Sequence, residues 1–229
     1  VLFERDANYF EKPAVHAHTG LMFGSFGRND QIADVSAGMP LGFINVTGSR
    51  SDSDDYKDGD GIKVHSSYTR WSLGSSAGWT PDKNTSLIFS LDRSDGEAAY
   101  ADRMMDGSKF DRTGYGLKFE KKFVSDLISK LKAQVYYNYV DHIMDNYSLR
   151  TETAGMYMLN NPDRKTKGGA LSADIILSDK VAATIGIDYQ QNKHTLRSWM
   201  DQAGHIDVDS KPRTPDMTFS NIGVFGDVT

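Results

Sequence analysis

The sequence predicts an all-β fold in which about ten antiparallel strands form part of the wall of a transmembrane β-barrel. Three observations lead to this class. Apolar and polar residues alternate with the period of two that strands require. Short and long connectors follow each other in turn, as they do in membrane barrels. No apolar run reaches the roughly 18 residues of a spanning helix, and the mean hydropathy is -0.51.

The clearest strand lies between Leu131 and Leu149. Taking every second residue places two sets of side chains on opposite faces. The wetter set is Gln134, Tyr136, Asn138, Val140, His142 and Met144. The apolar and aromatic set is Val135, Tyr137, Tyr139, Asp141 and Ile143. One wet face and one apolar face are typical of a barrel wall between lipid and lumen.

Similar segments recur along the whole chain. The ten predicted strands cover residues 14–26, 31–38, 42–50, 66–80, 85–95, 111–121, 131–148, 166–178, 181–195 and 217–228. Their connectors alternate in kind, and a soluble β-solenoid or sandwich has less reason to segregate them by side. Short turns are expected at 38–41, 80–84 and 178–180, with a longer one at 122–130 that has room for a helical turn. Polar loops are expected at 51–65, 95–110, 149–165 and 196–216, with a short one at 27–30.

Composition excludes several function classes. The net charge of -5 does not favour nucleic-acid binding, which requires a basic surface. The chain has no cysteine, so it contains neither a disulfide framework nor a thiolate metal site. No G-x-S-x-G, phosphate-binding loop or H-E-x-x-H motif occurs, and we therefore expect a protein that is not an enzyme.

His142 and Met144 are the first candidate metal ligands. Two residues apart on a strand, they share one face at about 7 Å between their Cα atoms. Imidazole nitrogen and thioether sulfur suit copper, the monovalent ion above all, because thioether is a soft ligand. The alternative interpretation is a half-buried histidine beside a packed methionine.

The distribution of methionine points the same way. Five further methionines fall in the predicted long loops, at the same end of the barrel as Met144: Met104, Met105, Met156, Met158 and Met200. Methionine prefers interiors, so its place in polar loops requires a reason. These residues are either low-affinity capture points for a soft metal or flexible filler between loops.

The other ligand-like groups are weaker candidates. The acidic loop 51–61 reads SDSDDYKDGDG, but the calcium-binding frame is incomplete and no glutamate closes it, so a solvated loop is favoured. His16 and His18 are expected to be wall residues. Three further histidines show no partner in the sequence: His65, His194 and His205.

Several segments together resemble the TonB-dependent copper receptors of the Gram-negative outer membrane. These segments read VLFER, YFEKP, SDDYKDGDG, GEAAYADRMMDGSKFDR, YYNYVDHIMDNYSLR and DRKTKGGAL. The resemblance covers nearly the whole chain and is densest from Gly96 to Gly169. The D-H-x-M-D-N-Y-S-L-R segment, followed by a loop that contains methionine, is the part specific to copper.

The resemblance implies an outer-membrane transporter, a segment of a 22-stranded antiparallel transmembrane β-barrel. In this family an N-terminal plug domain, pulled by the TonB complex from the periplasm, closes the barrel. Residues 1–13 are then the plug-to-barrel junction and 14–229 a partial barrel in outer-membrane lipid. We expect the chain to be a piece of a longer protein, without its plug and its C-terminal strands. By resemblance, His142 and Met144 form the barrel half of a copper site, as Cu(I) or Cu(II), whose other half is a C-x-x-x-M pair on the plug.

Two rival functions remain open at this point. A receptor of the same architecture for a siderophore or another metal chelate would place aromatic and arginine side chains in the vestibule. The arginines available for this are Arg50, Arg70, Arg93, Arg103, Arg112 and Arg150. The second rival is an adhesion or binding barrel that uses its long loops on a partner protein. An outer-membrane hydrolase is a more distant third.

Overall fold

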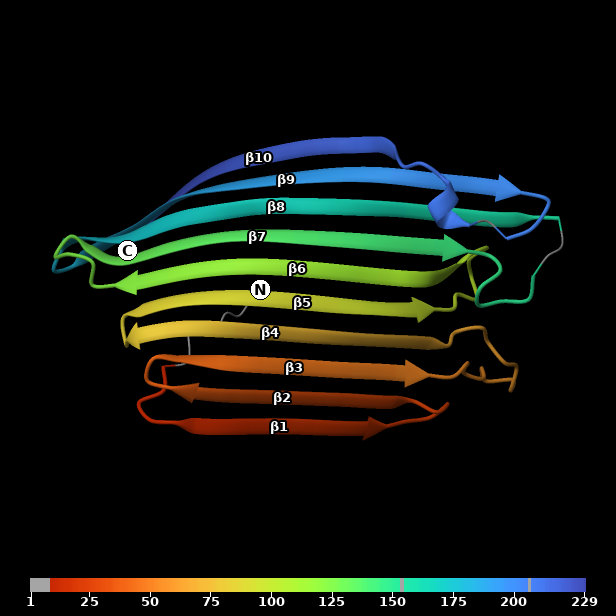
Figure 1. Ribbon diagram of the computed structural model, residues 1–229, viewed down its shortest axis with the longest axis horizontal. Helices are drawn as coiled ribbons and strands as arrows, with labels where there is room; N and C mark the ends of the chain where they lie inside the picture. Colours follow the sequence, from red (N-terminus) through yellow and green to blue (C-terminus); the bar gives the residue numbers. More distant parts are fainter. Residues whose placement is uncertain (1–8, 153–154, 206) are drawn as a thin grey trace.

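The computed structural model describes residues 9–152, 155–205 and 207–229. Ten strands form a single antiparallel sheet in the order of the sequence, from β1 to β10 (Figure 1). This arrangement confirms the predicted all-β fold. The strands are β1 Ala14–Phe23, β2 Asn29–Met39, β3 Gly42–Ser53, β4 Tyr68–Asp82, β5 Thr85–Ala98, β6 Asp106–Lys122, β7 Ile128–Asp145, β8 Tyr157–Ser178, β9 Val181–Asp201 and β10 Thr214–Val228.

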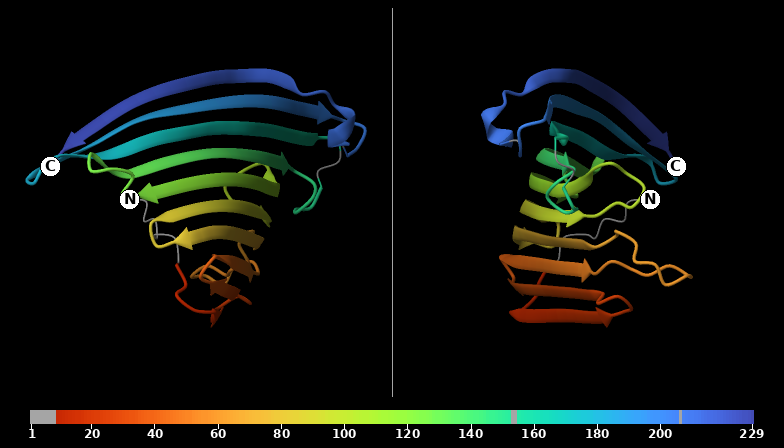
Figure 2. Two further views of the ribbon diagram at one scale, coloured as in Figure 1. Left: turned by 60° about the vertical axis from the view of Figure 1, so that its left-hand side comes forward. Right: turned by 90° about the vertical axis from the view of Figure 1, so that its right-hand side faces the viewer.

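The connectors separate by length to the two ends of the sheet. We call the end with short connectors the turn end, where β2–β3, β4–β5, β6–β7 and β8–β9 meet over residues 40–41, 83–84, 123–127 and 179–180. The opposite end is the loop end, with connectors 24–28, 54–67, 99–105, 146–156 and 202–213. The strands lengthen toward β8 and β9, and the sheet is twisted and curved (Figure 2). This segregation is the pattern of a membrane barrel wall.

One face of the sheet carries a continuous apolar band. Cross-strand partners on this apolar face line up in rows, because the ladder keeps its register through the middle of every strand. One row runs from β4 to β10 through Trp79, Leu87, Phe119, Ala133, Leu171, Ile187 and Val224. Val135 and Tyr137 lie on this face, as predicted. Most of these large side chains are exposed, since nothing in the described chain covers them.

The other face is polar along the same strands. One row there contains Asp34, Thr47, Asp92, Asn138, Thr166 and Asn192, separated by two glycines. Neighbouring side chains bond across the strands: Arg112 donates to Asn138 over 3.1 Å, and Thr166 donates to Asn192 over 2.7 Å. The polar face therefore carries Asn138, His142 and Met144 of the predicted wet set.

Close cross-strand packing on the polar face requires glycine at β8. A Cβ atom added to Gly168 would lie 2.5 Å from the hydroxyl of Tyr136 and 2.5 Å from the Tyr189 carbonyl oxygen. Glycine lets the Tyr136 side chain cross β8 and donate to Gln190 on β9 over 3.1 Å. The G-G pair of the DRKTKGGAL segment thus has a packing role.

Most predicted strands were too short at the loop end, whereas β7 ends at Asp145 and not at the predicted 148. β5, β6, β8 and β9 extend beyond the predicted boundaries 95, 111, 166 and 195. Part of the added sequence is polar on both faces, as at Asn160, Asn161 and Asp163 of β8. Where neighbouring residues are polar on both faces, the alternation that reveals a strand disappears.

Two further expectations about the connectors differ from the structure in their bounds. The first strand ends at Phe23 rather than at 26, and Phe26 and Gly27 take positive φ angles of 59° and 67° in a turn. The longer turn predicted at 122–130 is present, but it is confined to residues 123–127, and these residues form bends instead of the helical turn for which the sequence has room. Strand pairing up to Lys122–Lys130 satisfies the backbone groups that a helical turn would have used.

Helical structure is minor in the described part of the chain. A 3-10 turn at Val208–Ser210 (η1) lies between β9 and β10 (Figure 1). None of the described residues forms a helix long and apolar enough to cross a membrane.

The chain reaches β1 along the polar face at the turn end. Phe10 is buried and packs 6.4 Å from the ring of Phe43 and 6.0 Å from that of His16. Its ring lies where a Cβ atom of Gly38 would be, at 2.2 Å. Residues 1–8, which form most of the junction predicted at 1–13, lie outside the described residues. His16 and His18 are wall residues on β1, as the sequence suggested.

Candidate metal site

His142 and Met144 lie on the polar face of β7, three and one residues before the strand ends at Asp145. The imidazole of His142 stacks on the ring of Phe110 on β6, with 4.5 Å between the ring centres and 28° between the planes. Phe110 and His142 are direct cross-strand partners. The pair predicted from the sequence therefore shares one face and one end of the sheet.

The Nε2 atom of His142 is buried and has no hydrogen-bond partner among the described residues. Buried polar atoms in folded proteins are almost always paired, so an unpaired one requires an explanation. An imidazole nitrogen carrying a lone pair is a good ligand for a soft or borderline metal ion. Stacking on Phe110 fixes the ring, which reduces the entropy lost when the nitrogen binds an ion.

Gly107 has no Cβ atom, and the ring of Phe110 occupies the space that such an atom would fill. This glycine lies opposite Met144 in the β6–β7 ladder, next to a bulge at Ser108. A Cβ atom at position 107 would come within 2.2 Å of Cζ of Phe110, so only glycine lets that ring lie where it stacks on His142. The bulge shifts the register and brings Phe110 opposite His142.

Three methionines form a row across the same face. Met158 on β8 and Met200 on β9 are direct cross-strand partners. Met144 on β7 pairs with Asn160, which places Met158 on the diagonal. Direct partners have Cβ atoms about 5 Å apart and diagonal ones Cα atoms about 7–8 Å apart. Met144, Met158 and Met200 thus continue from His142 as a line of thioethers.

The other methionines of the sequence hypothesis are dispersed. Met104 is 68% exposed in the β5–β6 connector beside Met105, and Met156 is exposed just before β8. The sequence missed Met22 and Met217, which the fold also brings to the polar face near the loop end. Only Met39 lies at the turn end. Strand register, which the sequence reveals poorly, was the signal needed to find them.

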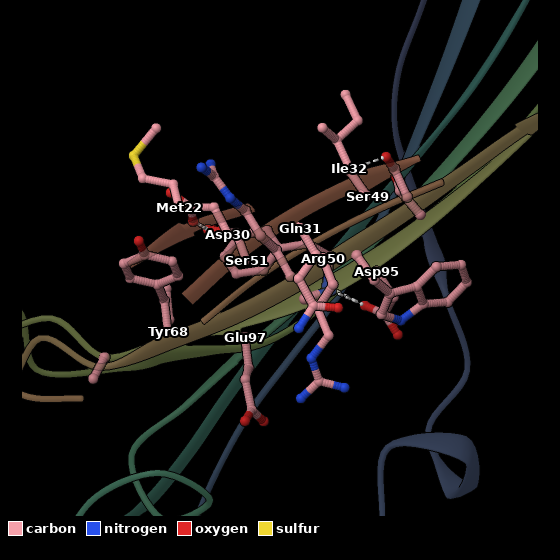
Figure 3. Close-up of a pocket in the computed structure, with 18 of the residues that line it drawn as sticks. Met22, Asp30, Gln31, Ile32, Ser49, Arg50, Ser51, Tyr68, Asp95 and Glu97 are labelled. Carbon is pink, nitrogen blue, oxygen red and sulfur yellow. Dashed lines mark hydrogen bonds between the residues drawn. The ribbon is translucent and has the colours of Figure 1, made fainter. Parts of the chain in front are cut away.

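A hollow of about 1020 Å³ lies beside the site on the polar face of β1 to β5. Figure 3 draws its lining, with Met22, Asp30 and Ser51 close together. Asp30 accepts hydrogen bonds from Ser51 and, over 2.9 Å, from Arg28. Phe110 belongs to the lining of this hollow as well as to the stack with His142.

One buried carboxylate ties three connectors together at the loop end. Asp106 is completely buried and accepts from Arg150 Nε over 2.8 Å and from Tyr100 N over 2.9 Å. His65 Nε2 lies 2.8 Å from the same carboxylate, and Arg150 also donates to the Arg103 carbonyl. Burial alone would raise the pKa of Asp106, but the bonds from Arg150, His65 and the Tyr100 amide lower it to about 2. We call this cluster the Asp106 anchor.

The connector between β9 and β10 is fixed differently. Arg213 pairs with Asp141 on β7 over 2.6 Å and donates to the carbonyl oxygen of Asn161 over 3.0 Å. Lys109 reaches the same Asp141 over 2.9 Å. Asp141 and Asn161 share the apolar face by their alternation, yet both are buried here, beyond the apolar band. The apolar face to which the sequence assigned Asp141 is therefore polar at this position, where the connector covers the sheet.

The acidic loop 51–61 forms a turn held by its own backbone. Asp58 accepts from the amides of Asp60 and Ile62 over 3.0 and 2.9 Å. Asp55 accepts from the amides of Ser66 and Ser67, both over 2.8 Å, and its pKa is lowered to about 2, chiefly by the bond from Ser66. In the described ranges no three His, Cys, Asp or Glu side chains are grouped as metal ligands. The interpretation of this segment as a loop without calcium stays a prediction.

Comparison with known proteins defines the class first. No protein-family model and no curated protein sequence matches the chain. Among solved structures, the ferric citrate transporter FecA in its unliganded form is similar over 97% of this chain and 36% of its own, with a TM-score of 0.63 and 13% identity. At that identity the match concerns the fold alone. The sheet is a wall segment of a barrel of the TonB-dependent transporter type.

The particular similarity is to the copper transporter OprC. It covers 99% of this chain and 35% of that one, with a TM-score of 0.91 and 39% sequence identity. This match confirms the resemblance to TonB-dependent copper receptors seen in the sequence. The chain spans about a third of the length of each of these transporters.

Proposed function

We propose that this chain is part of an outer-membrane, TonB-dependent transporter that binds and imports copper, with His142 and Met144 as primary ligands. The observation that carries the proposal is the unpaired, buried Nε2 of His142 beside a thioether on the polar face. The 39% identity to a copper transporter over almost the whole chain supports the choice of metal.

The donor set favours the monovalent ion. Imidazole and thioether are soft or borderline ligands, whereas Cu(II) prefers tetragonal nitrogen and oxygen donors. Met158 and Met200 continue the thioether line, and we assign them low-affinity capture of copper on its way to His142. Met104, Met105 and Met156 would contribute at most in the same way, from the connectors.

The fold is suited to the proposed partners. The apolar band faces outer-membrane lipid, and the polar face lines the lumen, where the plug domain of the intact protein lies. Phe10, packed on the polar face at the turn end, leads the chain from the lumen into β1 and supports residues 1–13 as the plug-to-barrel junction. TonB acts on the plug, and catalysis has no part in this function.

Metal analysis of the intact protein tests the proposal. The protein is loaded with copper(I), washed with a competing chelator, and compared with a His142→Ala, Met144→Ala double variant. We expect tightly bound copper in the wild type and its loss in the variant. A matched His18→Ala, Met39→Ala variant, with both changes away from the site, retains the metal. Equal copper in wild type and double variant would contradict the proposal.

A ferric-chelate receptor is the second candidate, because Arg70 and Arg112 do lie on the polar face. Two other arginines do not favour it, because Arg93 lies on the opposite face by its register and Arg150 is held by Asp106. A ferric siderophore that displaces bound copper, or binds when copper does not, would favour this candidate over the first.

A further inference from the structure

We propose a second soft-metal site, formed by His194 on β9 and Met217 on β10, that takes a monovalent copper ion. The inference rests on the proposed function, since it assigns a further copper site to the same vestibule. In the sequence His194 had no discernible partner, because Met217 lies 23 residues away in the next strand. The strand register supplies that partner.

The two residues are direct cross-strand partners in the β9–β10 ladder. A bulge between Pro215 and Met217 sets this register. Direct partners have Cβ atoms about 5 Å apart, close enough for an imidazole and a thioether to reach one ion. Phe219, two residues after Met217, pairs with Asn192 of the polar row, so Met217 also lies on the polar face.

The environment of His194 repeats that of His142. Its ring stacks on Phe219, with 5.9 Å between ring centres and 26° between the planes. Its Nε2 atom is buried and has no hydrogen-bond partner within the described ranges. Among the six histidines, these two share a phenylalanine stack, an unpaired buried Nε2 and a neighbouring methionine. The shared features make packing alone a poor explanation for both.

The charges around His194 select the ion. Arg164 on β8 is its cross-strand partner on the other side and is exposed. At any given distance, a positive charge repels a divalent cation twice as strongly as a monovalent one. One nitrogen and one sulfur, with a cation close by, therefore suit a soft monovalent ion and disfavour Zn²⁺ and Cu²⁺.

The second site is separate from the first. His194 lies two strands from His142, level with Val140, and the separation across the sheet is about 10 Å at the usual strand spacing. One ion cannot bind both imidazoles over that distance. Met217 is half exposed, so an ion held there stays open to the lumen and binds more weakly than at His142.

The test is a copper(I) titration of the intact protein, buffered with the chelator bicinchoninate. A His194→Gln, Met217→Leu variant keeps the side-chain volumes close to the original and preserves folding. We expect this variant to lose one weakly bound copper ion and to keep the tight one. The His142→Ala, Met144→Ala variant should show the reverse, and the combined variant should lose both. His205→Gln with Met22→Leu is the matched control and retains both ions.

A single substitution sharpens the test without removing a ligand. Arg164→Gln removes the neighbouring positive charge, and we expect severalfold tighter binding at the weak site only. If the wild type binds one copper ion and the His194→Gln, Met217→Leu variant binds it equally, the second site is overturned and the proposed function remains intact. A wild type that binds no copper would overturn both, and unchanged weak binding in Arg164→Gln would speak against the location at His194.

Discussion

His65 and His142 both lie near the loop end, yet their surroundings are opposite. His65 has its Nε2 atom 2.8 Å from the carboxylate of Asp106, within a cluster that also holds Arg150 and the Tyr100 amide. His142 presents a buried Nε2 atom with no partner among the described residues, on a ring that stacks on Phe110. The described residues supply a partner for Nε2 of His65 but none for Nε2 of His142.

The difference separates a structural role from a binding role. In the Asp106 anchor the carboxylate bonds to Arg150, to His65 Nε2 and to the Tyr100 amide, so the cluster fixes the connectors. At His142 the ring is stacked and its Nε2 atom is buried, yet this nitrogen has no hydrogen-bond partner among the described residues. Damage to the anchor should therefore loosen the connectors without removing copper, and damage at His142 should do the opposite.

The largest effect is expected for Asp106→Ala. The change leaves the partly buried Arg150 guanidinium without its anion, and breaking a buried pair costs up to about 3–5 kcal/mol. We expect proteolysis within the connectors 99–105 and 146–152 to become at least tenfold faster, because both lose their shared contact. Limited proteolysis of the intact protein followed by mass spectrometry measures this directly.

Asp102→Ala is the matched control, since Asp102 is an exposed carboxylate in the same connector. Its cleavage rate should equal that of the wild type. Tight copper binding should persist in Asp106→Ala. If copper is lost together with the connectors, the anchor and the metal site are one unit and the comparison fails.

Acid should release the anchor in a defined range of pH. The pKa of Asp106 is lowered to about 2 in the folded protein, from an ordinary value of about 4. A lowered pKa stabilises the fold above the ordinary value, and this stabilisation, about 2 kcal/mol, is lost as the pH falls from about 4 to about 2. Hydrogen exchange in the 146–152 connector should be flat from pH 7 to 4, after correction for the intrinsic rate, and then rise.

Asp106→Asn is the control for the acid range, because an amide does not titrate. In this variant the hydrogen-exchange rate of the 146–152 connector should show no rise between about pH 4 and about pH 2. The connector 146–152 is the one to measure, since Asp55 titrates in the same range but bonds within the connector 54–67. A step that persists in Asp106→Asn assigns the acid release to another carboxylate.

The sequence predicted the middle of the fold better than its ends. At Val135 and Tyr137 apolar side chains on one face alternate with polar-face neighbours, and this alternation is visible in one sequence. At Asn160, Asn161 and Asp163 both faces are polar, so nothing in the sequence marks a strand. The predicted boundaries failed where this alternation ends.

The candidate site was predictable only where its residues are neighbours in sequence. His142 and Met144 stand two apart, and simple alternation places them on one face. Met217 beside His194 and Phe110 beside His142 depend on register across a ladder and on a bulge in each case. A shift of one residue would move either partner to the other face, and the sequence alone does not reveal the bulges.

Gly107→Ala gives the smallest effect and tests the link between the two regions, because Gly107 follows Asp106 in sequence and lies opposite Met144. The new methyl group would come within 2.2 Å of the Phe110 ring, which must shift away from its stack on His142. A displaced stack costs about 1 kcal/mol, so we expect copper(I) binding to weaken about fivefold while proteolysis of the connectors stays unchanged. Gly48→Ala, where a Cβ meets no atom within 4 Å, is the control and should leave both unchanged. Unaltered copper affinity in Gly107→Ala would mean that Phe110 does not position the imidazole, and the binding role of the stack would have to be abandoned.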